Sequence, residues 1–330
     1  MPIVFPPITV NKQGYSIPLD VRVRCAVPDE GIREHISHNV EHNLPEVGID
    51  PEHSLVMAIA CSGPSLFDSV DYLRDVALQN PNVRILAVKS SHDFLIDNGI
   101  IPWGCILLDG REHVKDMFRA DSRVTYFAAS MCAESTFDYL KESGAKIVVW
   151  HAAVGAKEGE VIKRKHVIIG GGSTSPLRAM PMGYTMGFRN FMFFGLDSCF
   201  TDQKIHYYLD TKKQDGTERA IVVRTAGREF RTTPEMIGQA QDFETLITAP
   251  QSPKFGITMV GDGLNKHRWD NRIYFPVDQV QNGNIPCYTP YQFNMAQNQK
   301  ETEEERIKQE EEKKKRWNPN PLKPNEQKAA

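Results

Sequence analysis

Residues 59–66 read IACSGPSL, and this stretch decides the predicted fold. An apolar run ends at Ala60, an amphipathic segment begins at Leu66, and five small or conformationally special residues lie between them. This order predicts a buried strand, a tight turn and a helix. The turn is either no more than a connection or a cradle for a negatively charged group, because the free N–H groups of a helix start attract anions. Within it Gly63 allows close backbone approach, Pro64 follows, and Ser65 can cap the helix.

Similar apolar runs recur along the chain as strand candidates, at residues 55–60, 83–89, 105–109, 124–129, 146–152, 166–170 and 191–197. Each is a continuous apolar run rather than a strict alternation, which is typical of strands buried on both faces of a parallel sheet. Helical segments are expected between several of them, at residues 66–79, 92–98, 113–118, 134–142 and 176–188. The alternation predicts an α/β fold with a doubly wound, mostly parallel sheet.

Four regions follow from the composition: an N-terminal extension (1–53), the α/β domain (54–265), a C-terminal extension (266–296) and a charged tail (297–330). Near the end of the domain, residues 220–233 read as a hairpin that turns at Ala226-Gly227, and Thr233-Pro234 opens a helix. A last strand is expected within residues 255–264. The tail, KETEEERIKQEEEKKKRW and beyond, is either a solvated, disordered or partly helical segment or an arm for a protein partner.

Bulk properties exclude several classes of protein. The net charge of -3 argues against a dedicated nucleic-acid binder. The six cysteines form no CxxC pair, which favours reduced, buried thiols in a cytoplasmic protein. The first residues lack the pattern of a signal peptide, and no stretch approaches about 20 apolar residues, so neither secretion nor a membrane span is expected.

A second glycine-rich turn, IIGGGSTSPLRAM at residues 168–180, is a stronger candidate for an anion cradle than the first. Gly171 and Gly172 offer free backbone N–H groups, Ser173 and Thr174 add hydroxyl groups, and a helix start follows. Arg178 lies in the first turn of that helix and could contact a phosphate or carboxylate. The alternative interpretation is a capped helix after a packing turn.

Acidic and histidine side chains complete the list of candidates. Asp197 closes the strand FMFFGLD, His206 follows in a polar loop, and Asp109 ends the strand CILLD. The two aspartates could share one metal ion, but without a third ligand no metal site is predicted. His151 ends a further strand and is expected to be a buried, hydrogen-bonded histidine.

Taken in order, these motifs resemble a known family. The chain is similar to the domain shared by motility-accessory-factor proteins and 6-hydroxymethylpterin diphosphokinase MptE-like proteins. Four motifs carry the resemblance: GPSL after a strand, AVKSSHDFLIDNGIIPWGCILLD, GGGSTSPLRAMPMGYTMGFRNFMFFGLDSCF and GREFRTT. That domain is itself distantly similar to the sialyltransferases of glycosyltransferase family 42. The resemblance covers roughly residues 35–265. It implies a Rossmann-like sheet that binds a nucleotide, with both glycine turns and Asp109 near it, and His206 as general base. The chain departs from the pattern at Trp103, where relatives often carry an aspartate.

Three functions are therefore open. The first is a glycosyltransferase that uses a nucleotide sugar, with phosphates on the two glycine turns and His206 or Asp197 as the base. The second is a diphosphokinase that binds ATP and a pterin-like alcohol and needs Mg²⁺ held by carboxylates such as Asp109 and Asp197. The third is a non-catalytic nucleotide-binding or structural protein. Beyond the possible Mg²⁺ of the second function, no cofactor is predicted.

Overall fold

A computed structural model describes residues 3–12, 15–18, 26–154, 166–201, 204–206, 209–210, 220–249 and 252–274 of the 330-residue chain. These residues all belong to one unit, Met1–Gly283, and the second unit, Asn284–Ala330, lies outside the described residues. The expectations for the charged tail and for residues 275–296 therefore stay predictions.

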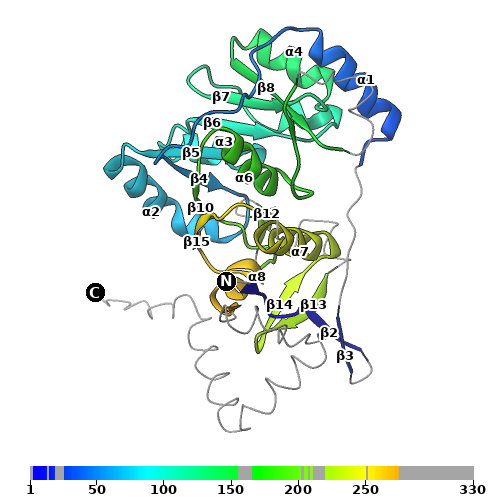
Figure 1. The fold of residues 1–330 in the computed structure, drawn as a ribbon, viewed down its shortest axis with the longest axis vertical. Coiled ribbons are helices and arrows are strands. Elements are labelled where there is room, and N and C mark those ends of the chain that lie inside the picture. Colours follow the sequence, from blue (N-terminus) through cyan, green and yellow to red (C-terminus); the bar gives the residue numbers. More distant parts are fainter. Residues whose placement is uncertain are drawn as a thin grey trace, which may run out of the picture. The chain divides into compact units, whose positions relative to one another are not determined.

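The core of the described unit is an eight-stranded sheet in which every pairing is parallel (Figure 1). Its order is β15-β10-β4-β5-β6-β7-β8-β9. The strands are β4 (Val56–Ala60), β5 (Val83–Val88), β6 (Gly104–Leu107), β7 (Thr125–Ala129), β8 (Lys146–Ala152), β9 (Ile168–Ile169), β10 (Asn190–Phe194) and β15 (Gly256–Val260). From β4 the chain adds β5 to β9 on one side, then returns to place β10 and β15 on the other. The strand order thus reverses between β4 and β10, and this confirms the doubly wound fold.

Helices pack on the sheet because this contact buries their apolar sides away from water. The α-helices are α1 (Asp29–Val40), α2 (Ser65–Gln79), α3 (His92–Asp97), α4 (Glu134–Glu142), α6 (Ser175–Thr185), α7 (Pro234–Thr248) and α8 (Leu264–Asp270). Two 3-10 helices, η1 (Lys89–Ser91) and η2 (Glu112–Met117), follow β5 and β6. Helix α2 packs on β5 and β10, whereas α6 packs on β4, β5, β6 and β9. Ile59 and Phe193, side by side on β4 and β10, are fully buried between the layers.

Most of the predicted elements are present, with two corrections. The strand predicted at residues 191–197 ends at Phe194, because Gly195 turns the backbone with a φ of 67°, so Asp197 lies in the loop beyond the strand. Residues 113–118, expected as a helix, fall mainly within the 3-10 helix η2. The hairpin of β13 (Ile221–Thr225) and β14 (Arg228–Thr232) turns where predicted, and Thr233 caps α7 by accepting a bond from the Met236 N–H.

The N-terminal residues carry strands that the sequence did not predict. Strand β1 (Ile3–Val4) pairs with β16 (Ile273–Tyr274), and β2 (Thr9–Lys12) and β3 (Tyr15–Pro18) extend the hairpin into the sheet β14-β13-β2-β3. A separate pair joins β11 (Lys204–His206) and β12 (Leu209–Asp210). Phe5 is buried against Phe243 and Trp269, with ring centroids 6.2 Å away in each case. The buried Arg268 donates to the Pro6 carbonyl. The extension is therefore part of the folded unit.

The cysteines and the hydropathy of the helices agree with the expectations from composition over the described residues. Cys61, Cys105, Cys132 and Cys199 are buried and free of disulfides, as predicted; the other two cysteines lie outside the described part. Among the described helices, none is both long enough and apolar enough to cross a membrane.

Candidate functional site

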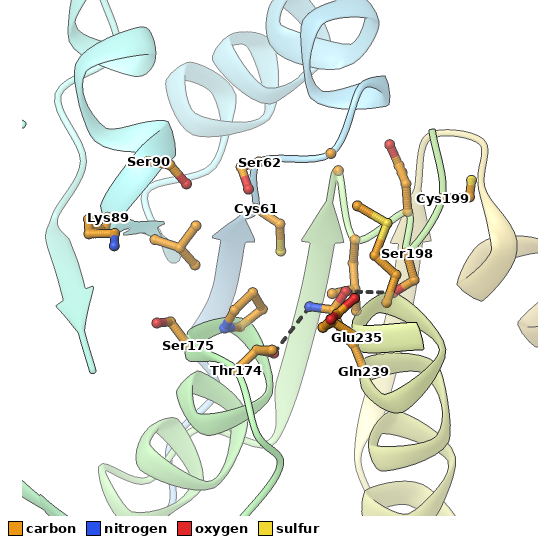
Figure 2. Close-up of a pocket in the computed structure, with 17 residues that line it drawn as sticks. Cys61, Ser62, Lys89, Ser90, Thr174, Ser175, Ser198, Cys199, Glu235 and Gln239 are labelled. Carbon is orange, nitrogen blue, oxygen red and sulfur yellow. Dashed lines mark hydrogen bonds between the residues drawn. The ribbon is translucent and has the colours of Figure 1, made fainter. Parts of the chain in front are cut away.

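A cleft of about 280 Å³ opens at the carboxyl edge of the sheet, where the strand order reverses (Figure 2). The loops after β4, β5 and β10, the start of α6 and the first turns of α7 line it. Open α/β sheets bind their ligands at this position, because the loops on the two sides diverge there. The polar and charged residues in its lining include Ser62, Lys89, Ser90, Thr174, Ser175, Asp197, Ser198, Glu235 and Gln239.

The start of helix α6 faces this cleft. Thr174 is the N-cap residue, but its side chain makes no capping hydrogen bond, and Ser175 and Pro176 line the hollow. The Thr174 hydroxyl instead accepts a hydrogen bond of 3.1 Å from Gln239 on α7. The first N–H groups of a helix carry a partial positive charge. This end of α6 is thus suited to bind an anion.

Lys89 brings a positive side chain to the same hollow. It lies beside Ser90, Ser62 and Ser175 in Figure 2, on the side opposite Glu235 and Gln239. The Lys89 Nζ donates to Asp109 Oδ2 at 3.0 Å, and only 15% of its side chain is exposed. A lysine and a helix start in one cleft form the positive pair that phosphate groups favour.

Asp109 contacts Lys89 but does not line the cleft itself. Besides Lys89, the Arg111 guanidinium donates to both of its carboxylate oxygens. Burial alone would raise the pKa of Asp109, but the bonds and charges of Arg111 and Lys89 hold it far below its usual value. Asp109 therefore orients Lys89, and a direct contact between Asp109 and a nucleotide stays a prediction.

The first glycine turn is filled by a carboxylate of the chain itself. The Ser65 N–H donates to Asp197 Oδ2 at 2.8 Å, and the Ser65 hydroxyl donates to Oδ1 at 2.6 Å. Ser65 is the first residue of α2 after the N-cap Pro64, so it does not cap the helix as expected. A Cβ atom on Gly63 would lie 2.4 Å from the Gly195 carbonyl oxygen. The group cradled at the start of α2 is thus Asp197, and the glycine permits the close approach of the two loops.

Asp197 combines burial with a place in the wall of the cleft. It is 4% exposed, and burial raises its pKa to about 7 although the Ser65 bonds oppose this shift. The next residue, Ser198, adopts a φ of 51°, donates to Gln239 Oε1 and accepts from Asn265. Backbone held in this region by several bonds is common at functional sites.

The second glycine turn is also held by side chains of the chain. The Ser173 N–H donates to Asp242, and a Cβ on Gly172 would lie 2.6 Å from Leu177 Cδ1. Gly171 takes a φ of 132°. Arg178 donates to three backbone carbonyls, those of Ala153, Ile169 and Gly172. Of this predicted cradle Thr174, Ser175 and Pro176 line the cleft, whereas the glycines and Ser173 do not. The bonds of Arg178 favour a positioning role over a phosphate contact.

The structure describes the backbone of β11 but not its side chains, so the role of His206 stays a prediction. Sequence reasoning missed Lys89, Ser90 and Gln239. The first two directly follow the strand β5, so the same rule that selected Asp109 and Asp197, the carboxyl end of a buried strand, could have found them.

Comparison with known proteins agrees with this fold. Residues 34–203, more than half of the chain, match the family described as 6-hydroxymethylpterin diphosphokinase MptE-like. The chain belongs to this MptE-like family. The resemblance predicted from the motifs is thereby confirmed. The match includes both glycine turns, Lys89 and Asp197, but not the α7 side of the cleft.

A solved structure shares the fold of the MptE-like chain. It is the MAF glycosyltransferase from Magnetospirillum magneticum AMB-1, with a TM-score of 0.50 and 12% sequence identity. The superposition covers 90% of this chain and 45% of that one, so the chain spans less than half of that structure. No curated protein sequence matches.

Proposed function

We propose that the chain is a nucleotide-dependent transferase that binds the phosphate groups of its donor between the start of α6 and Lys89. One observation carries this proposal: the start of α6, whose N-cap side chain makes no capping bond, shares a cleft with a lysine where the strand order of the sheet reverses. The serine hydroxyls of Ser62, Ser90 and Ser175 in the same hollow can donate further bonds to phosphate oxygens.

The reaction that fits this cleft best is glycosyl transfer from a nucleotide sugar. An acceptor hydroxyl oxygen would attack the anomeric carbon, and the bond from that carbon to the phosphate oxygen would break. The N–H groups of α6 and the Lys89 ammonium would stabilise the departing phosphate. The acceptor proton would pass to Asp197, because a carboxylate with a pKa of about 7 is suited to accept a proton near neutral pH. His206 is the second candidate for this base.

A diphosphokinase is the second candidate function, and the description of the family favours it. Diphosphoryl transfer from ATP uses Mg²⁺ held by carboxylates. Asp109, one of the two carboxylates expected to hold Mg²⁺, is held by Lys89 and Arg111 instead. Asp197 and Glu235 line the cleft. We prefer glycosyl transfer because it uses Asp197 as the base and needs no metal ion held by Asp109.

A thermal-shift screen tests the proposal. CMP, CDP, UDP and UMP, or ATP with Mg²⁺, should raise the melting temperature of the wild type if bound. We expect a cytidine or uridine nucleotide to stabilise the protein and Lys89→Met to reduce its affinity about tenfold or more. Lys115→Met, on the exposed surface of η2, is the matched control and should bind as the wild type does.

The outcomes separate the alternatives. Stabilisation by ATP with Mg²⁺ alone would favour the diphosphokinase. No stabilisation by any nucleotide, or equal affinity in Lys89→Met and the wild type, would contradict the proposed phosphate site.

A further inference from the structure

A second polar cluster lies at the far edge of the sheet, on β8 and the two segments that cover its edge. Glu46 forms an isolated parallel bridge with Val149, and the adjacent Val47 N–H donates to the Val149 carbonyl at 2.8 Å. Strand β9 then pairs with the end of β8, His151 opposite Ile168. His166 precedes β9 by two residues. Backbone pairing thus brings together three side chains from three separate parts of the sequence.

The ligand atoms of Glu46, His151 and His166 all lie within 4.8 Å of one another. His151 Nε2 is 3.4 Å from Glu46 Oε2, and His166 Nδ1 is 2.7 Å from the same oxygen. Ligands of a tetrahedral zinc ion, at about 2.0–2.1 Å from the metal, are about 3.3 Å apart. The spacing between His151 and Glu46 is close to this value, whereas His166, now 2.7 Å from the carboxylate oxygen, would have to move to complete the set.

His151 has one ring nitrogen that contacts Glu46 without a hydrogen bond of regular geometry. Its side chain is 2% exposed, and its Nε2 is buried without a hydrogen bond to any residue that the structure describes. The other ring nitrogen, Nδ1, lies 3.0 Å from the Ser130 hydroxyl. When Nδ1–H donates to that hydroxyl, Nε2 carries a lone pair that faces a carboxylate oxygen. Two electron-pair donors at this distance favour a cation between them.

The surroundings of Ser130 resemble the outer shell of a metal site. Asn39 is buried and donates to the carbonyls of Ser130 and Cys132, and the Ser130 N–H donates to the Trp150 carbonyl. The hydroxyl that orients His151 is therefore fixed in place. Histidine ligands of metals commonly donate their second ring N–H to such a group, which sets the tautomer and the ring orientation.

We propose that Glu46, His151 and His166 form a binding site for a divalent transition metal, with Zn²⁺ as the best fit, that fastens β9 and the segment at residues 45–47 to the edge of β8. Two imidazole groups and one carboxylate are ligands that such ions prefer. The side chain of Glu46 is 35% exposed, so a water molecule can reach a fourth position. This site lies outside the cleft of the proposed function and does not depend on it.

Metal titration of the full chain tests the proposal. After dialysis against a chelator, Zn²⁺ is added, and the bound metal is measured by mass spectrometry beside the melting temperature. We expect about one Zn²⁺ per chain and a rise of about 4 °C or more, because a metal that binds the folded state stabilises it. Mg²⁺ should give no rise, since imidazole is a poor ligand for it. Co²⁺ at the same site should give the visible absorption of a tetrahedral ion.

The variants Glu46→Gln and His166→Ala change partly exposed side chains and should leave the fold intact. Each should weaken Zn²⁺ binding at least about tenfold and remove most of the thermal shift. His113→Ala, at an exposed histidine, is the matched control and should bind as the wild type does. A wild type that binds no Zn²⁺ above background, or binding that is equal in both variants and the wild type, would overturn the proposal and leave a Glu–His ion pair in its place.

Discussion

At the scale of single residues, Gly63 and Asp197 explain how the two central loops meet. Gly63 lets the turn after β4 pass close to the Gly195 carbonyl, and Asp197 then receives two hydrogen bonds from Ser65. The contacts join positions that are 132 residues apart in the sequence. The turn at the switch point is therefore one structure built from two loops, and both loops line the cleft.

Gly63→Ala should destabilise the protein by about 1–3 kcal/mol, because the new methyl group would overlap the Gly195 carbonyl and the Asp197 carboxylate. Gly170→Ala is the matched control, since a Cβ there meets no atom within 4 Å. Urea unfolding of both variants measures the difference. Equal stability of the two would show that the loops do not pack as described.

The pH dependence of stability should report on Asp197. Its pKa is about 7 in the folded protein and 3.8 in its ordinary state, so between these values the folded chain holds a proton that the unfolded chain releases. The free energy of unfolding should therefore fall as the pH rises through this window, by up to about 1.4 kcal/mol per pH unit. Asp197→Asn should flatten this slope in urea unfolding from about pH 4 to about pH 8. The same slope in wild type and variant would contradict a raised pKa.

How far the sequence predicts these residues depends on the distance to their partners. The position of Asp197 after an apolar strand follows from the local pattern, but its bond to Ser65 does not, because nothing local marks a contact across the sheet. For the same reason Gly172 was expected to face a ligand, whereas it faces Leu177. Gly172→Val should therefore lower the free energy of unfolding, because its side chain would overlap Leu177.

At the scale of elements, the start of α6 is tied to α7 and to the loop after β10 by one side chain. Gln239 donates to the Thr174 hydroxyl and accepts from the Ser198 hydroxyl, as Figure 2 shows. These two bonds hold the α6 start beside the loop that carries Asp197. The parallel strands and the caps of α7 were predictable from apolar runs and the Thr-Pro pair. Strands β1 to β3 were not, because their own patterns are short and because β1 and β2 pair with strands more than 200 residues away.

Gln239→Leu removes both of these bonds at similar volume. We expect a loss of about 1–2 kcal/mol in unfolding free energy, since two hydroxyl groups lose their partner. Nucleotide affinity should fall as well, because the α6 start is then less fixed. Gln241→Leu, on the same helix but outside the cleft lining, is the control in calorimetric titration. A Gln239→Leu protein with unchanged affinity and stability would show that the bridge has no role.

At the scale of the whole molecule, the N-terminal residues pack against the last helices of the described unit. Phe5 packs against Phe243 and Trp269, and the Arg268 guanidinium binds the Pro6 carbonyl and Glu244. The hydrophobic core therefore includes both ends of the described chain. The predicted boundary at residue 53 separates regions by composition, whereas packing joins them.

Phe5→Ala should cost about 3–5 kcal/mol, as expected for a buried phenylalanine. Ile49→Ala, at a side chain that is 78% exposed, should change stability by less than about 0.5 kcal/mol. Thermal and urea unfolding of the two variants give the comparison. A Phe5→Ala protein as stable as Ile49→Ala would contradict the docking of the N-terminal segment.

The central claim is that donor phosphates bind between the start of α6 and Lys89. A crystal structure of the protein with the nucleotide that stabilises it most tests this directly. We expect phosphate oxygens within hydrogen-bond distance of the Ser175 N–H and the Lys89 Nζ, with the rest of the nucleotide across the carboxyl edge of β4 and β5. A nucleotide bound elsewhere, or bound in the cleft with its phosphates away from both groups, would contradict it.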